Sequence, residues 1–295
     1  MNDRPSDSPG VAGGNATLPA RLVGATVTVT RHGEPEPGGL RELSGLGGGE
    51  HLRVHADGGR AVIWADRVGH ICVEQGRKVA IHPQPGLDDE YLAAYLYGLV
   101  ATLVLGQQKR FALHASTVAV DGTRVALSGN RGAGKTTTSL SLVARGAEPV
   151  TDDLTVLDVD DPRVHTVSIG RPLHVWPDTI EMVGLDLGPA VSDGADGSKL
   201  TIPWVDAEPG EVAAVVVLVP DDVSEPVIGR LSGSDAFVAV DIQTSWRTVV
   251  SQIWPTELFA WRATVAHRLP VFELRRPREG WPLDDLCERI EGLVR

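Results

Sequence analysis

Residues 129–136 read Gly-Asn-Arg-Gly-Ala-Gly-Lys-Thr, the pattern of a phosphate-binding loop. Glycines at this spacing let successive backbone N–H groups turn toward one anion. We expect Lys135 to reach the β- and γ-phosphates of a nucleotide and Thr136 to hold Mg²⁺ through its hydroxyl. The expected nucleotide-binding residues are Gly129, Asn130, Arg131, Gly132, Ala133, Gly134, Lys135, Thr136 and Thr137.

The segments on either side of the loop have the patterns that the motif requires. Residues 124–128 are mostly apolar and predict a buried strand, and residues 137–145 predict a helix that Gly146 ends. A helix that starts at the loop would add its partial positive charge to the anion site. A glycine loop arising by chance would lack this order of strand, loop and helix. The sequence therefore predicts nucleotide binding.

A pair of adjacent carboxylates, Asp152 and Asp153, forms the second candidate feature. In phosphoryl transfer one carboxylate holds Mg²⁺ and another takes the proton of the attacking hydroxyl. We assign both residues to catalysis, with Asp153 and Thr136 as metal ligands, although the residues alone leave open which aspartate is the base. The alternative is a helix cap or a turn, where such pairs are common.

A rival acidic pair follows the apolar run of residues 212–219. An apolar strand that ends in an aspartate is the usual metal-binding partner of a phosphate loop. Here Pro220 precedes Asp221 and Asp222, and this composition favours a turn. The turn interpretation makes this pair the weaker candidate for the metal site.

Four further residues could assist the chemistry. His114 lies at the start of a predicted strand that pairs with the strand before the loop, although a lone histidine is more often structural. Lys199 follows a glycine- and aspartate-rich segment and could neutralise a transferring phosphoryl group. Arg171 and His174 could line a substrate pocket or lie in a solvated loop.

Composition excludes several classes of function. The net charge of −12 argues against extended nucleic-acid binding, and the two cysteines have no metal-type spacing. The N-terminus lacks an apolar secretory segment, so we expect a cytoplasmic protein. Residues 91–106 are apolar but shorter than the roughly 20 residues needed to span a bilayer. They predict a buried helix and no membrane association.

Changes in composition along the chain suggest three parts. Residues 1–20 predict a disordered tail, and residues 21–86 a β-rich unit of short strands separated by glycine turns. Residues 87–295 form the predicted α/β nucleotide-binding domain. Two strands, residues 113–120 and 123–127, predict a hairpin with Asp121-Gly122 at its turn.

The order of Leu-His-Ala-Ser at 113–116, the glycine loop and Thr-Asp-Asp at 151–153 resembles the catalytic domain of HPr kinase/phosphorylase. The Gly-Ser-Lys-Leu of residues 197–200 and the apolar run of residues 212–219 extend the resemblance. It implies an α/β P-loop kinase core of the HPr kinase and phosphoenolpyruvate carboxykinase type, ATP and Mg²⁺ as cofactors, and phosphorylation of a serine hydroxyl. Asp152, Asp153 and His114 would be the family's functional residues.

The loop departs from the HPr kinase pattern, since Arg131 and Thr136 stand where that family favours serines. The chain looks more like the divergent relatives that include the lasso-peptide tailoring kinases. This implies an ATP-dependent kinase acting on a hydroxyl, of serine above all, in a peptide or small molecule. HPr kinases assemble as hexamers, so the resemblance implies a homo-oligomer, although no feature of the sequence itself indicates one. The alternatives are a nucleotide-binding sensor or assembly protein and an ATPase without phosphoryl transfer to a second substrate.

Overall fold

The computed structural model divides the chain into two compact units, Met1–Val104 and Leu105–Arg295. It describes residues 19–30, 33, 35–46, 51–87, 89–170, 173–185, 200–202, 207–280 and 282–294. Almost all of the predicted N-terminal tail lies outside these residues. The sequence analysis placed a boundary after residue 86, whereas the compact units divide inside a helix, between Val104 and Leu105.

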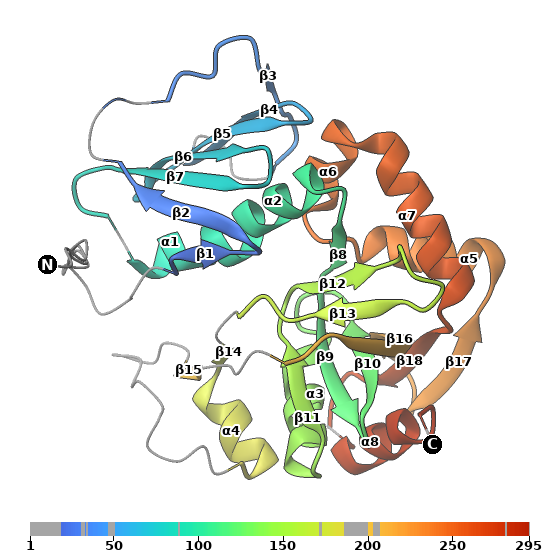
Figure 1. The fold of residues 1–295 in the computed structure, drawn as a ribbon. Helices are drawn as coiled ribbons and strands as arrows, with labels where there is room; N and C mark the ends of the chain where they lie inside the picture. Colours follow the sequence, from blue (N-terminus) through green and yellow to red (C-terminus); the bar gives the residue numbers. More distant parts are fainter. Residues whose placement is uncertain are drawn as a thin grey trace, which may run out of the picture. The chain divides into compact units, whose positions relative to one another are not determined.

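The first unit contains a seven-stranded sheet in the order β1-β2-β7-β6-β5-β4-β3 (Figure 1). Its strands are β1 (Arg21–Leu22), β2 (Ala25–Val29), β3 (Arg41–Glu42), β4 (Leu52–Ala56), β5 (Arg60–Ala65), β6 (Gly69–Glu74) and β7 (Lys78–Pro83). All neighbours are antiparallel except β2 and β7, which are parallel. These strands confirm the short strands predicted for this unit. They could be predicted because glycine turns and alternating apolar residues specify them locally.

The apolar segment after this sheet is helical, as predicted. It forms α1 (Asp89–Tyr95), the π-helical η2 (Leu96–Val100) and α2 (Ala101–Gln107). Leu96, Leu99 and Leu103 are fully buried, so burial in a protein core explains the apolar run. Among the described residues, no helix is long and apolar enough to cross a membrane.

The second unit is a mixed α/β structure built on a sheet of nine described strands. The strands are β8 (Phe111–Leu113), β9 (Ala115–Val120), β10 (Thr123–Ser128), β11 (Glu148–Thr151), β12 (Thr155–Asp158), β13 (His165–Val167), β16 (Gly210–Asp221), β17 (Val227–Leu231) and β18 (Val271–Pro277). At its centre β10, β16 and β18 run parallel, flanked by antiparallel β9 and β17. Parallel strands place their carboxyl ends at one edge, where ligands of such sheets bind.

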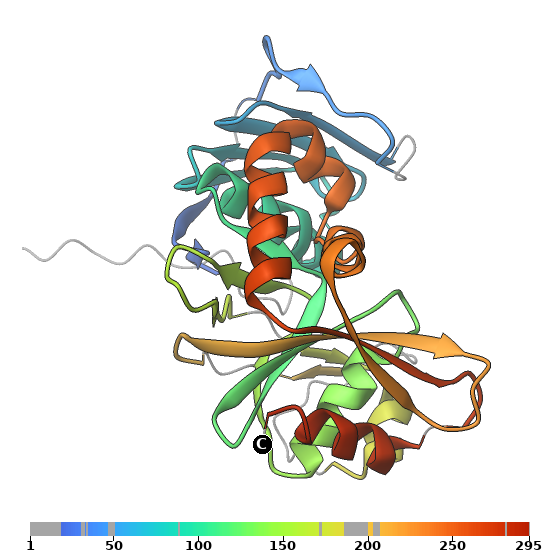
Figure 2. The same cartoon turned by 90° about the vertical axis from the view of Figure 1, so that its right-hand side faces the viewer.

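Helices cover this sheet. They are α3 (Lys135–Ala144), α5 (Gly233–Ile242), α6 (Arg247–Ile253), α7 (Pro255–Arg268) and α8 (Leu283–Glu291). α8 lies beside α3 in both views (Figure 2), and the two helices share an apolar core with the central strands. Separately, β14 (Leu173–Val175) pairs with β15 (Leu200–Ile202), and α4 (Pro177–Val183) follows β14.

The predicted hairpin before the loop is confirmed with one change. β9 and β10 pair antiparallel and are joined by Asp121 and Gly122, both of which have positive φ, as a two-residue hairpin turn requires. The segment from Leu113 is not one strand, because Leu113 pairs with β12 and the chain then bends at His114 into β9. His114 therefore lies between β8 and β9, immediately before Ala115.

The expected turn at Pro220 is wrong. β16 continues through Pro220 to Asp221, and these residues pair with β18 opposite Arg276 and Pro277. Val215 directs its N–H toward the β18 side, so Pro220, five residues on, faces the opposite side. A proline is tolerated there because β10 has already ended, with Ser128 opposite Val217. The composition of Pro-Asp-Asp therefore did not indicate the local structure.

Candidate functional site

The glycine loop lies between the end of β10 at Ser128 and the start of α3 at Lys135. Gly129 has a φ of +142°, and a Cβ atom there would lie 2.6 Å from the carbonyl oxygen of Leu218 on β16. Gly134 has a φ of +98°, in the left-handed region that glycine adopts without steric cost. The predicted strand and helix on either side of these glycines are thus confirmed, and the segment between them packs closely against the neighbouring parallel strand.

Lys135 folds back over this loop. Its side chain is buried, with 7% of the residue exposed, and Nζ donates a hydrogen bond of 2.8 Å to the carbonyl oxygen of Gly129. Burial lowers the pKa of Lys135, while Asp153 and Asp152 oppose that shift. Both carboxylates therefore lie close enough to act on the ammonium group electrostatically.

The paired aspartates follow β11 and meet the start of β9. The Ser116 hydroxyl donates a 2.7 Å hydrogen bond to Oδ1 of Asp152, whose residue is only 3% exposed. Asp153 is more accessible, and its φ of +59° is uncommon for a residue with a side chain. The pairing of Thr151 with Thr117 on β9 brings the two segments together.

His114 lies against the second aspartate. Its Nδ1 is 3.1 Å from the backbone oxygen of Asp153 and 4.0 Å from Oδ1 of the same residue. Because a carbonyl oxygen only accepts, this contact places a proton on Nδ1. The structure therefore brings together four predicted site residues: Lys135, Asp152, Asp153 and His114.

Arg276 on β18 donates hydrogen bonds to the glycine loop, a role that the sequence did not predict. It is 2% exposed, and its Nε and Nη2 donate to the carbonyl oxygens of Ala133 and Gly132 at 3.0 and 3.2 Å. Its Nη1 donates to the oxygen of Pro277 at 2.7 Å. Since two loop carbonyls are held by the guanidinium, the loop conformation is fixed at its tip. β18 also contains Glu273 and Arg275, so its sequence does not single out Arg276.

Gln243 braces the beginning of the loop. Its Oε1 accepts the N–H of Gly129 at 3.1 Å and lies 2.9 Å from the Ser128 hydroxyl, and its backbone oxygen accepts the N–H of His114 at 2.7 Å. Arg262 holds the same turn through Thr244 Oγ1 at 3.0 Å. One buried residue after α5 thus connects the glycine loop with His114. No local motif marks this residue.

The remaining candidates stay outside this cluster or outside the description. Lys199 and Arg171 lie outside the described residues, and only the backbone of His174 is described, in β14. In the rival acidic pair, Asp221 lies 3.8 Å from Nη1 of Arg275 and Asp222 lies 2.9 Å from Nε of Arg278. Both carboxylates are therefore paired with arginines, Asp222 on the surface and Asp221 half-buried.

The donor set suits Mg²⁺. Thr136 in the first turn of α3 and the two aspartates offer oxygen ligands, which this ion prefers. Within the part of the chain that is described, no group of three or more His, Cys, Asp or Glu side chains gathers as a metal site. Mg²⁺ beside a nucleotide needs only one or two carboxylates, because phosphates and water supply the other ligands.

No family model matches the chain, and no curated protein matches it. Among solved structures, it is similar to the HPr(Ser) kinase/phosphatase from Coxiella burnetii, with 18% sequence identity and a TM-score of 0.32. The matched region covers 62% of this chain and 87% of that chain. At this TM-score the similarity establishes neither a family nor an activity, so the functional conclusion depends on the residues of the site.

Proposed function

We propose that the protein is an ATP-dependent kinase that transfers the γ-phosphate to a hydroxyl group. The observation that carries this proposal is the position of Lys135, which is buried in a glycine loop and lies within electrostatic reach of Asp152 and Asp153. A loop alone would support nucleotide binding only. The carboxylates beside it provide what transfer to an acceptor additionally requires.

Several groups would hold the triphosphate. The backbone N–H groups of the loop and the N-terminus of α3 present partial positive charge, and Lys135 adds a full charge. Arg276 and Gln243 keep the loop in one conformation, so little ordering is needed when the nucleotide binds. Thr136 and one aspartate would hold Mg²⁺, which when bound neutralises charge on the phosphates.

The reaction would proceed by direct transfer. The acceptor oxygen forms a bond to the γ-phosphorus, the bond between that phosphorus and the β–γ bridging oxygen breaks, and ADP leaves. The acceptor proton passes to Asp152 or Asp153, whichever is not bound to the metal. His114 and Lys199 would stabilise the charge as it moves. Most of the acceleration would come from positioning and electrostatics.

The acceptor is proposed as a serine hydroxyl of a peptide, or a small molecule with a similar group. The sequence resemblance to lasso-peptide tailoring kinases supports a peptide, and the net charge of −12 disfavours nucleic acid. A cytoplasmic location and a homo-oligomeric assembly belong to the same proposal.

Two isosteric variants test the proposal. Asp152→Asn and Asp153→Asn should each lower phosphoryl transfer by about 10²- to 10⁴-fold, since each removes a base or a metal ligand. The variant that lost the base should bind Mg-ATP like the wild type, whereas the variant that lost the metal ligand should need more Mg²⁺. This difference assigns the two roles.

Asp222→Asn is the matched control, because it changes one aspartate of the exposed pair at the end of β16. It should leave both transfer and Mg-ATP affinity unchanged. If both site variants kept wild-type ATP turnover, the aspartates would have no catalytic role. Binding of Mg-ATP by the wild type and by both variants, without any turnover, would fit a nucleotide-binding sensor. Turnover that needs no acceptor would identify an ATPase.

A further inference from the structure

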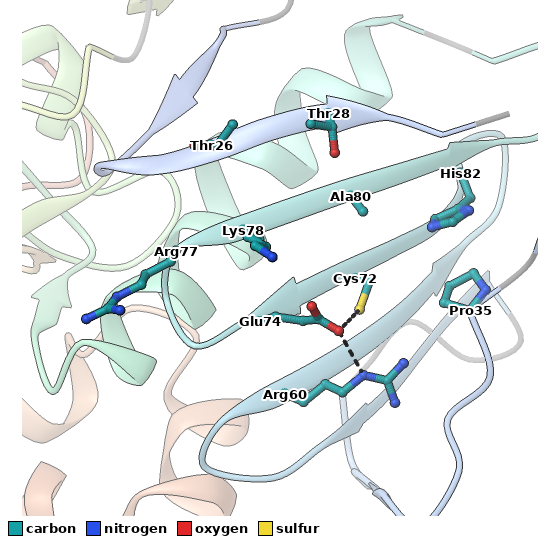
Figure 3. Close-up of a pocket in the computed structure, with 10 residues that line it drawn as sticks. All are labelled: Thr26, Thr28, Pro35, Arg60, Cys72, Glu74, Arg77, Lys78, Ala80 and His82. Carbon is teal, nitrogen blue, oxygen red and sulfur yellow. Dashed lines mark hydrogen bonds and ion pairs between the residues drawn. The ribbon is translucent and has the colours of Figure 1, made fainter.

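The outer face of the first unit's sheet carries a cavity of about 560 Å³ (Figure 3). β2, β7, β6 and β5 supply its floor, and Pro35 lies at one end. Its volume falls in the range of small-molecule sites, about 300–1,000 Å³. All its described lining residues belong to this unit, so it is separate from the nucleotide site of the second unit.

Strand register explains which side chains line the cavity. Lys78 on β7 lies opposite Glu74 on β6, and Glu74 lies opposite Arg60 on β5. Directly opposed residues in a sheet project from the same face, so these three side chains form one row across the strands. Thr26 on β2 continues the row beyond Lys78.

Ion pairs do not join all the charged side chains of this row. Nε of Arg60 lies 3.4 Å from Oε1 of Glu74, and the Cys72 thiol also approaches that oxygen, at 3.7 Å. Among the described residues, Lys78 makes no ion pair, although Glu74 is its cross-strand neighbour. Arg77 adds a third cation at the rim, its guanidinium directed away from the others (Figure 3).

The described lining therefore has three cationic side chains and one carboxylate in a chain whose net charge is −12. The net positive charge of the lining, in a protein whose overall charge is negative, attracts anions. His82 lies beside Pro35, at the end of the cavity away from Arg77 (Figure 3), and its buried Nδ1 has no hydrogen-bond partner in the described structure. Buried polar atoms are normally satisfied, so a ligand or water that reached this nitrogen would complete its hydrogen bonding. Ala80 and Pro35 add apolar surface.

We propose that this cavity binds a small organic anion through a carboxylate or phosphate group. Lys78 and Arg60 contact the oxyanion, His82 provides a hydrogen bond, and Ala80 and Pro35 pack against the carbon skeleton. Charge-assisted hydrogen bonds to lysine and arginine are the strong contacts of such sites. The proposal does not depend on kinase activity in the second unit.

Calorimetric titration of the full chain with citrate and with inorganic phosphate, at constant ionic strength, tests the proposal. Binding of citrate alone identifies a carboxylate ligand, binding of phosphate alone a phosphate ligand, and binding of both a general oxyanion site. Lys78→Gln should weaken the binding about tenfold or more. Arg21→Gln is the control, because it removes one exposed cation from the same unit outside the cavity. No binding of either probe, or equal binding by Lys78→Gln, would overturn the proposal.

The two cysteines provide a second readout. Cys72 lines the cavity, whereas Cys287 is fully buried in the second unit. The bound anion should slow the alkylation of Cys72 by iodoacetamide at least several-fold, and should leave the labelling of Cys287 unchanged. Equal slowing at both cysteines would indicate general stabilisation of the fold and contradict binding in the cavity.

Discussion

Arg276 offers the sharpest test of how the phosphate loop is held. Replacing it by methionine keeps the length of the side chain and removes its donors to the carbonyl oxygens of Gly132 and Ala133. A hydrogen bond from a charged group contributes about 1.5–3 kcal/mol. In the variant, nucleotide binding must itself order the part of the loop that this contact holds. If the free energy of even one such contact is lost in this way, affinity for Mg-ATP should fall about 10- to 150-fold.

The assay is calorimetric titration of Mg-ATP into wild type, Arg276→Met, Arg276→Lys and Arg275→Met. Arg275 is the matched control, because it is the adjacent arginine and forms half-exposed ion pairs with Asp221 and Glu273. Arg276→Lys retains one donor, so it should recover part of the affinity. Because Arg276 positions the loop without touching the phosphates, KM should rise more than kcat falls.

A folded Arg276→Met variant that binds Mg-ATP within about threefold of the wild type would refute the reasoning, since three times corresponds to less than one hydrogen bond. Urea unfolding of each variant shows whether the fold is retained. Loss of stability in Arg276→Met with unchanged affinity would assign Arg276 to folding alone.

Further predictions follow from single contacts. Lys135→Met should abolish measurable Mg-ATP binding by calorimetry, because it removes the buried cation whose Nζ lies 2.8 Å from the carbonyl oxygen of Gly129 in the loop. Gly129→Ala should weaken Mg-ATP binding at least tenfold in the same assay, since its Cβ would meet the backbone of β16. Gln243→Leu should reduce kcat as well as affinity in steady-state assays, because Gln243 contacts both the loop and His114. Burial raises the pKa of the Cys287 thiol to about 12, above its ordinary value of 9.0, so the folded state keeps a proton that the unfolded state loses. Stability should therefore fall as pH rises from 9 toward 12, and urea unfolding of Cys287→Ala should show a flatter dependence over that range.

Local patterns predicted much of this structure. The turn at Asp121 and Gly122, the strand and helix around the loop, and the short strands of the first unit all depend on residues near one another in sequence. The meeting of Asp152 with the loop was also expected from motif order. The contact is indirect: β9 lies between β11, which precedes Asp152, and β10, which precedes the loop.

The supporting residues could not be predicted in this way. Arg276 and Gln243 reach the loop from segments more than 100 residues further along the chain, so their roles follow from the pairing of β18 with β16 and from the turn after α5. No local pattern specifies such contacts. At Pro220 the tertiary pairing of β16 with β18 overrode the turn preference of the local sequence. The placement of Lys199 stays a prediction.

The most direct test of the central claim is mass spectrometry of reactions that contain Mg-ATP, the protein and one acceptor each: free serine, HPr, or precursor peptides of lasso-peptide pathways. The account predicts that one acceptor gains a single phosphate, that ADP forms in equal amount, and that Asp152→Asn and Asp153→Asn suppress both products. ATP binding without transfer to any acceptor in the panel, or ATP consumption that yields only free phosphate, would contradict it.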